Sequence, residues 1–300
     1  AVGNSAGQTT QGGDAVAIGD SAGATTQGVS AVAVGNQAGQ TDQGTASVAV
    51  GQQAGETTQG FNAIAMGYLA GQSSQSSSSL AVGVQAGRTT QGSSSVAIGN
   101  LAGTTTQGAS SIAIGDSAGN YTQGATAVAI GHDAGKGSVA VGDFQGINSI
   151  AIGNSAGQTA QLSYGVAIGH TSGRTNQGQY TVALGYASGQ NDQSNNSVAV
   201  GRDAAKDTQS SGSVAVGYSA GKTTQGGNSV AVGISAASGN QGSYGVAIGT
   251  QAAQTDQSNF GVAIGNLSGQ TTQGASAVAV GNSAGNSAQG ASSVAVGINA

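Results

Sequence analysis

Residues 96–111 read Val-Ala-Ile-Gly-Asn-Leu-Ala-Gly-Thr-Thr-Thr-Gln-Gly-Ala-Ser-Ser, and close variants of this 16-residue unit account for the whole chain. We number the unit from its valine, so that its first glycine is position 4. This glycine recurs every 16 residues, except for two intervals of 11 residues between Gly131 and Gly153. A fixed period of this length is typical of a repeat protein, so we predict the secondary structure of one 16-residue unit and apply it to every copy.

The unit predicts strands and not helices. Glycine at positions 4, 8 and 13 would each destabilise a helix by about 1 kcal/mol relative to alanine. Positions 1 and 3 hold Val, Ile, Leu or Met in nearly every copy, which is the period-2 pattern of a short strand. Positions 9 to 12, rich in Thr and ending in Gln, predict a second extended segment, with glycine-rich corners around it. The sequence therefore predicts an all-β, parallel β-solenoid of about twenty 16-residue coils with two short strands each.

Composition excludes several classes of function. The 300 residues contain no Cys and only two His, which removes disulfides, thiolate chemistry and the usual zinc sites. Six Lys and Arg against eleven Asp and Glu argue against a nucleic-acid partner. No apolar run approaches the length of a membrane helix, so we expect no membrane insertion within this segment. His132 and His170 share position 5, where we interpret them as solvated turn residues, and we expect neither a cofactor nor enzyme activity.

Position 2 is alanine in every copy. Strand alternation turns it away from positions 1 and 3, which we assign to the core. A solvated position would vary, so we predict that this second face packs against neighbouring subunits and that the protein is an oligomer. The predicted subunit-contact column contains Ala17, Ala33, Ala49, Ala65, Ala97 and Ala113.

Position 12 is Gln in all full-length coils. Identical amides stacked one coil apart can hydrogen-bond along the axis, as in the ladders of cross-β structures. We predict such a ladder, because a buried amide without partners is costly; the alternative is a merely polar corner. The predicted ladder contains Gln11, Gln27, Gln43, Gln59, Gln75, Gln91, Gln107 and Gln123.

We expect residues 1–300 to form a single solenoid array, with two shortened coils at 131–153. The shortened coils predict a waist, with Phe144 and Ile147 filling the gap, and a tolerated deletion is favoured there over a bend or a binding notch. No capping element is present at either end of the array, so the sequence reads as a segment of a longer fibre.

The motif Ser-Val-Ala-Ile-Gly at residues 95–99, and Ser-Ile-Ala-Ile-Gly at 149–153, resembles the head repeat of trimeric autotransporter adhesins, the YadA-like head. The stretch Ala-Gly-Gln-Thr-Asp-Gln-Gly at 38–44 is similar to repeats in fibre proteins of bacteriophages and large viruses. The resemblance implies a left-handed β-roll wound into a homotrimer. The adhesin heads use somewhat shorter coils, so no ligand-binding residue is transferred.

We therefore expect a non-enzymatic structural or adhesive fibre shaft or head, extracellular, on a virion or a cell surface. Its partners would be other copies of the chain, in a homotrimer, and a host-surface glycan or receptor. The alternatives are a self-assembling extracellular filament, or an ice-binding protein that uses the Thr columns at positions 10 and 11. Those columns are interrupted by residues such as Asp42, Asp192 and Tyr121, which disfavours ice binding.

Aromatic residues at position 15 are the candidate glycan contacts. Exposed rings can stack on sugars. We expect these rings to be isolated from one another, however, and favour the interpretation that they plug gaps between coils. The four residues are Tyr164, Tyr180, Tyr244 and Phe260.

Overall fold

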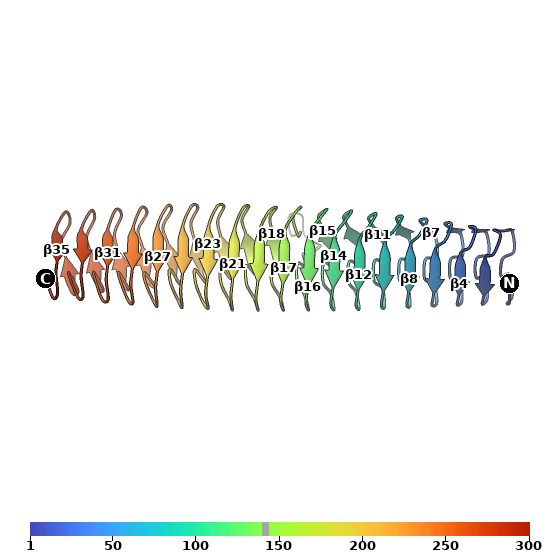
Figure 1. Cartoon of the computed structure of the whole chain (residues 1–300), viewed down its shortest axis with the longest axis horizontal. Helices are drawn as coiled ribbons and strands as arrows, with labels where there is room; N and C mark the ends of the chain where they lie inside the picture. The colour runs from blue at the N-terminus through green and yellow to red at the C-terminus, as the bar shows by residue number, and fades with distance from the viewer. Residues whose placement is uncertain (140–143) are drawn as a thin grey trace. The chain divides into compact units, whose positions relative to one another are not determined.

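The computed structural model describes residues 1–139 and 144–300, which fall into two compact units, residues 1–155 and 156–300. Each unit is described by itself. Strands and turns make up the described residues, and none of these residues is helical (Figure 1). None of them accordingly forms an apolar helix of membrane-spanning length.

Unit 1 contains two parallel sheets. Positions 1 to 3 of successive coils form the VAI sheet, with strands β2 (Val16–Ile18), β4 (Val32–Val34), β6 (Val48–Val50), β8 (Ile64–Met66), β10 (Leu80–Val82), β12 (Val96–Ile98), β14 (Ile112–Ile114), β16 (Val128–Ile130) and β17 (Ile150–Ile152). Positions 11 and 12 form the TQ sheet, with strands β1 (Thr10–Gln11), β3 (Thr26–Gln27), β5 (Asp42–Gln43), β7 (Thr58–Gln59), β9 (Ser74–Gln75), β11 (Thr90–Gln91), β13 (Thr106–Gln107) and β15 (Thr122–Gln123).

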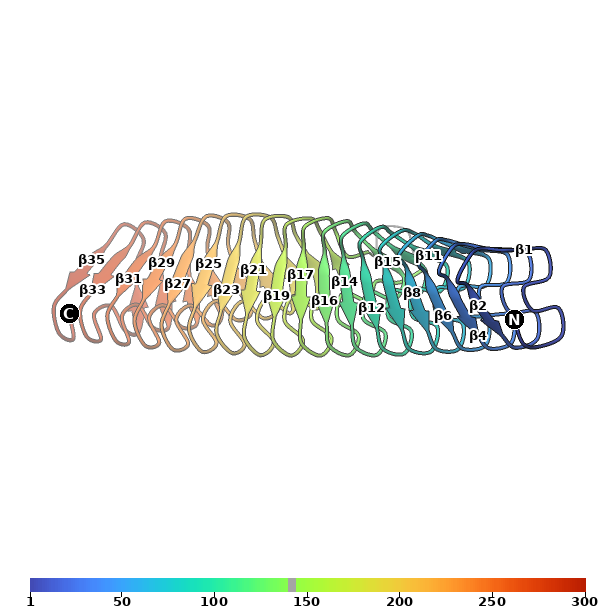
Figure 2. The same ribbon diagram turned by 45° about the vertical axis from the view of Figure 1, so that its right-hand side comes forward.

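Unit 2 repeats this arrangement. Its VAI sheet consists of β19 (Val166–Ile168), β21 (Val182–Leu184), β23 (Val198–Val200), β25 (Val214–Val216), β27 (Val230–Val232), β29 (Val246–Ile248), β31 (Val262–Ile264), β33 (Val278–Val280) and β35 (Val294–Val296). Its TQ sheet consists of β18 (Thr159–Gln161), β20 (Thr175–Gln177), β22 (Asn191–Gln193), β24 (Thr208–Gln209), β26 (Thr224–Gln225), β28 (Asn240–Gln241), β30 (Asp256–Gln257), β32 (Thr272–Gln273) and β34 (Ala288–Gln289). Figure 2 shows the VAI strands of this unit following one another side by side.

Successive coils pair in register, so that every residue lies beside its own equivalent. Ala97 pairs with Ala113, and Gln91 pairs with Gln107. The backbone bonds run between coils: the Val96 amide donates to the Ser111 carbonyl at 2.9 Å, and the Gly99 amide donates to the Val82 carbonyl at 2.8 Å. The predicted parallel β-solenoid is therefore confirmed, with nine VAI strands in each unit.

The predicted orientation of the VAI strands is wrong. The alanines of position 2, assigned above to a subunit contact, are completely buried within the chain itself, as in Ala65 and Ala97. The aliphatic side chains of positions 1 and 3 point the other way and remain half-exposed: Ile64 is 36% exposed and Met66 is 44% exposed. The two faces of the strand alternate as predicted, but position 2 faces the interior of the coil and positions 1 and 3 face outward. The same holds for the other members of the column: Ala17, Ala33, Ala49 and Ala113.

The reason is that the interior of the coil is filled from position 12. A Cβ added at Gly71 would lie 2.8 Å from the Gln75 Oε1 and 3.3 Å from the Ala65 Cβ, so the amide and the methyl group share the same space. The glutamines are the largest fully buried side chains of the structure. Once a Gln occupies a coil this narrow, only methyl-sized or hydroxyl-bearing side chains fit opposite it, and the large aliphatic residues are placed outside.

The two short coils predicted at 131–153 do not each add a strand to the VAI sheet of the described residues. Strand β16 pairs directly with β17, and Gln123 bridges to Gln145. The strand expected around 139–142 lies largely outside the described residues. Phe144 is 37% exposed and Ile147 is 51% exposed, so neither fills a gap between coils. The number of coils is therefore below the expected twenty. No VAI strand lies between β16 and β17, and the first repeat contributes only an isolated bridge at Val2.

The backbone conformation and the packing at position 4 explain why this position is always glycine. Its φ lies between 124° and 135°, a region that L side chains rarely adopt. A Cβ at Gly217 would also lie 2.5 Å from the Gly233 carbonyl oxygen of the next coil. The glycine is therefore required both by the corner and by the close stacking of coils.

We predict that Gly217→Ala destabilises the protein and that Gly227→Ala does not. The first change combines a disallowed backbone conformation, costing about 1–3 kcal/mol, with a clash against the next coil. At Gly227, in the adjoining turn, φ is not positive and the nearest atom to an added Cβ, the Ser211 carbonyl oxygen, is 3.5 Å away. Urea unfolding of both variants measures the difference; equal midpoints would contradict the explanation.

Candidate functional site

The glutamine ladder lies inside the solenoid. In unit 2 it is continuous: each Nε2 donates to the Oε1 one coil on, over eight links of 2.8–3.3 Å from Gln161 to Gln289. The same Nε2 donates to the position 1 carbonyl of its own coil, for example from Gln225 to Val214 at 2.8 Å. Each amide thus joins the TQ sheet to the VAI sheet and one coil to the next.

In unit 1 the ladder is interrupted. Four links are present: Gln11 to Gln27, Gln59 to Gln75, Gln75 to Gln91 and Gln107 to Gln123, at 3.1–3.2 Å. The Oε1 atoms of Gln43, Gln59 and Gln107 have no hydrogen-bond partner. Their Nε2 donors still reach the strand carbonyls, as from Gln43 to Val32 at 2.7 Å. Apart from Gln11, which is exposed, these amides are buried and are shielded from any ligand.

The first exposed candidate is the aliphatic stripe, which we define as the position 1 and position 3 side chains of the VAI sheet. It continues through all nine VAI strands of each unit without a polar residue. In unit 2, Leu184 is 43% exposed and Ile248 is 40% exposed. Single chains rarely present a contiguous apolar surface of this extent to water, which makes the stripe a candidate interaction surface.

The aromatic residues of position 15 stack in pairs across adjacent coils. The rings of Tyr164 and Tyr180 are 4.9 Å apart and 9° from parallel, and those of Tyr244 and Phe260 are 5.2 Å apart and 3° from parallel. Between 48% and 58% of each residue is exposed. The expectation that these residues are isolated plugs is wrong, since each has a partner and none is enclosed. Stacking covers one face of each ring, which leaves less ring surface for a sugar.

A second column was missed by the sequence analysis. At position 5, His170, Tyr186, Arg202 and Tyr218 occupy four consecutive coils. His170 stacks on Tyr186 with centroids 5.2 Å apart, and the Arg202 guanidinium lies 5.7 Å from the Tyr186 centroid and 5.6 Å from that of Tyr218. The 16-residue spacing of these residues, with a ring or a guanidinium at position 5 of four successive coils, is the sequence signal that predicts this column.

The TQ sheet presents hydroxyl groups. In the first seven coils, positions 10 and 11 are Thr or Ser throughout, with Asp42 the single exception. The neighbouring position 9 side chains bond to one another along the solenoid: Gln72 Nε2 donates to Glu56 Oε2 at 2.7 Å, and Arg88 Nε donates to Gln72 Oε1 at 3.0 Å. These longer side chains are thereby tied along the edge of the hydroxyl-bearing face.

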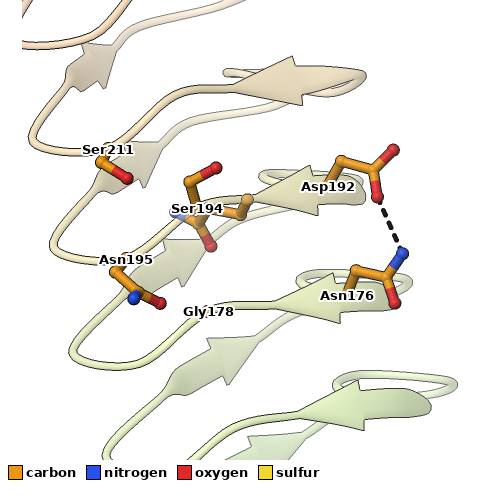
Figure 3. Close-up of a pocket in the computed structure, with 7 residues that line it drawn as sticks. Asn176, Gly178, Asp192, Ser194, Asn195 and Ser211 are labelled. Atoms are coloured by element: carbon orange, nitrogen blue, oxygen red, sulfur yellow. Dashed lines mark hydrogen bonds between the residues drawn. The ribbon is translucent and has the colours of Figure 1, made fainter.

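Unit 2 contains a groove of about 340 Å³ at the end of the TQ strands (Figure 3). Asn176 and Asp192 face each other from β20 and β22, and Asn176 Nδ2 donates to Asp192 Oδ1 at 2.8 Å. Asn195, on the turn after β22, accepts from the Gln179 amide at 2.8 Å. Asn176 and Asp192 are thus paired with each other, and Asn195 is paired with the backbone of Gln179.

Acidic and histidine side chains come together at one place of unit 1, around His132. Asp116 accepts from Asn100 at 2.9 Å, and His132 Nε2 lies 4.0 Å from Asp116. Across residues 1–139 and 144–300, no group of three or more His, Asp or Glu side chains could hold a metal ion. No protein-family model, curated protein or solved structure matches the chain.

We predict that Gln209→Glu makes stability depend on pH. Burial raises the pKa of a carboxyl group, so in the folded variant this acid titrates above its unfolded value of about 4.3. The protonated acid keeps a donor for the Val198 carbonyl, which accepts from Gln209 in the native ladder. Stability relative to the native chain is then retained below about pH 4 and lost as the pH rises through the folded pKa.

Thr208→Glu is the matched control, because Thr208 is the exposed neighbour of Gln209 on β24. Thermal unfolding from pH 4 to pH 8 should separate the two variants. A Gln209→Glu variant that unfolds in parallel with Thr208→Glu over this range would show that position 12 tolerates a buried charge.

Proposed function

We propose that this chain is a non-enzymatic structural element that associates laterally with other copies of itself through the aliphatic stripe, as the shaft or head of an extracellular attachment fibre. The stripe is the single observation that carries the proposal. Its side chains were assigned to the core from the sequence, but they lie outside, where they need a partner to leave water. Self-association buries them.

The spacing of side chains along the aliphatic stripe favours another copy of this chain as the partner. An aliphatic pair recurs at every coil, about 4.7–4.9 Å apart, through nine strands of each unit. A surface that packs into this pattern needs the same spacing over the same length. The VAI sheet of another copy provides it, and side chains of the two sheets can then interdigitate.

The homotrimeric state and the left-handed winding belong to this proposal and are supported by the resemblance of the repeat to YadA-like heads. Three VAI sheets facing a common axis would cover all three aliphatic stripes. Such a closed trimer would also leave no free stripe to which further copies could add. The TQ sheets and the turns would remain outside, available to a host-surface glycan or receptor. Placement on a virion or a cell surface is part of the same proposal.

We predict that the triple variant Val200→Lys, Val216→Lys and Val232→Lys dissociates the assembly. These residues are position 3 of three consecutive coils, and lysines there would be desolvated at the contact without disturbing the interior of the chain. Sedimentation velocity should give three times the 28.1 kDa chain mass for the native protein and a single chain for the variant.

The matched control is Thr208→Lys, Thr224→Lys and Asn240→Lys, which adds the same charges to position 11 of the TQ sheet, on β24, β26 and β28. This variant should remain assembled. A native protein that sediments as one chain at every concentration would overturn the proposal, and so would dissociation by the control variant alone.

Ice binding is a second candidate, favoured by the hydroxyl-bearing face of unit 1. Threonine places a methyl and a hydroxyl group at regular intervals along parallel, in-register strands, and in residues 9–106 only Asp42 breaks the two columns. The hydrogen-bonded side chains of Glu56, Gln72 and Arg88 lie along the edge of this face.

We predict that, if this face binds ice, Thr58→Lys with Thr90→Lys abolishes thermal hysteresis. The two lysines would interrupt the array on β7 and β11. Thr208→Lys with Thr224→Lys, in the less regular face of unit 2, should retain it. Absence of thermal hysteresis in the native protein would dismiss this function and leave the fibre proposal untouched.

A further inference from the structure

We propose that Arg202, held between Tyr186 and Tyr218, binds the carboxylate of an acidic sugar. The proposal rests on the attachment function proposed above and names the class of ligand that the surface would recognise. It is carried by the position 5 column of unit 2, which the resemblance does not assign.

The column fixes the guanidinium in place. Tyr186 and Tyr218 lie one coil before and one coil after Arg202, and the Arg202 Cζ is 5.7 Å and 5.6 Å from their ring centroids. The guanidinium thus lies between two rings, and His170 extends the column by one more coil through its stack on Tyr186. Arginine stacks on aromatic rings without losing its in-plane hydrogen bonds, so the edge of the group remains free to recognise a planar anion.

One part of that edge is already engaged. The Arg202 Nε lies 3.4 Å from Asp203 Oδ2, and Asp203 is almost buried. Within the described part of the chain, the two terminal nitrogens of Arg202 have no hydrogen-bond acceptor. The Arg202 side chain is 64% exposed. A stacked arginine with two free, parallel donors matches the two oxygens of a carboxylate.

A second cation, Lys206, shares the Asp203 carboxylate with Arg202. Lys206 Nζ lies 3.8 Å from Asp203 Oδ1, so Asp203 is flanked by two cations. Unit 2 has four basic and four acidic residues, whereas unit 1 has two basic and seven acidic residues. An anion is therefore repelled less in unit 2 than in unit 1, and the exposed Arg202 is the cation that it can reach at this column.

The covered ring faces disfavour a neutral sugar. Sugars bind aromatic side chains through the faces of the rings, and in this column His170 and Arg202 occupy both faces of Tyr186 and Arg202 occupies one face of Tyr218. What remains outward is the guanidinium edge and the phenol hydroxyls of Tyr186 and Tyr218, about half of each tyrosine being exposed. Charged recognition of a carboxylate, with hydroxyl contacts to the sugar, uses these groups.

Saturation-transfer NMR on the assembled protein tests the proposal with two acidic probes, the methyl glycosides of N-acetylneuraminic acid and glucuronic acid, against methyl glucoside and acetate. We expect binding of at least one acidic glycoside at about millimolar concentration, corresponding to about −4 kcal/mol. Arg202→Gln should weaken it at least about tenfold, and Arg202→Lys should weaken it as well, since an ammonium cannot form the two parallel bonds.

Arg174→Gln is the matched control, because Arg174 is an exposed arginine of the same unit whose Nε donates to Gln158 at 3.1 Å. This variant should bind as the native protein does. Binding that survives Arg202→Gln, equal binding of methyl glucoside or acetate, or no binding of either acidic glycoside would each overturn the site. Sedimentation of the same samples reports on self-association separately, so the failure of this site is distinguishable from the failure of the fibre proposal.

Discussion

The structure depends on one buried group, the amide of the position 12 glutamine. Its Nε2 bonds to a carbonyl of the facing strand and, in unit 2, to the next amide along the solenoid, so one side chain links the two sheets and successive coils. A buried amide is stable only when its hydrogen bonds are made, and the in-register stacking of identical coils provides a partner at a fixed spacing. The same amide occupies the interior, which leaves room only for small side chains at position 2 and moves the aliphatic residues outside. Packing within the chain and the surface offered to a partner therefore have a common origin.

Much of the fold could be predicted from the sequence because the repeat tests each position many times. The period and the two strands per coil follow from residues that recur in every full-length coil, such as Gln107 and Gly99. The amide ladder predicted for Gln11 to Gln123 is present only in part in unit 1 and is continuous in unit 2. The direction of the strand faces could not be predicted in this way. Alternation separates Ala97 from Val96 and Ile98, but it does not say which face is inside, and the usual assumption that larger aliphatic residues are buried gave the wrong answer. The glutamine column held the missing information, since an interior occupied by an amide cannot also hold two aliphatic side chains.

The corners and the surface columns show a second limit of sequence reasoning. Corners were expected where glycine is frequent, yet positions 6 and 15 are also left-handed, with φ near 56° at Leu101 and 60° at Tyr244. Backbone bonds between coils hold these residues in a conformation that their own preferences disfavour. Stacked rings at position 15, and the column around Arg202, arise because in-register coils place equivalent side chains about one coil rise apart. Such contacts depend on neighbours in space, and they become visible only when the sequence is compared at intervals of 16 residues.

The repeat also explains why the residues that stabilise the fold and the residues that could bind a ligand occupy different positions of the unit. Residues at positions 2, 4 and 12 pack against the equivalent residues of the coils before and after. A substitution in one coil therefore disturbs two neighbouring coils, and these positions stay constant. Positions 5 and 15 meet their copies at the surface, where Asn100 and Asp116 can form a hydrogen bond in one place and Tyr186 and Arg202 can stack in another. Each surface column can therefore change over a few coils without affecting the interior. A solenoid of this kind can hold its apolar stripe constant along its length while it confines a charged, ring-bounded group to a single coil of unit 2.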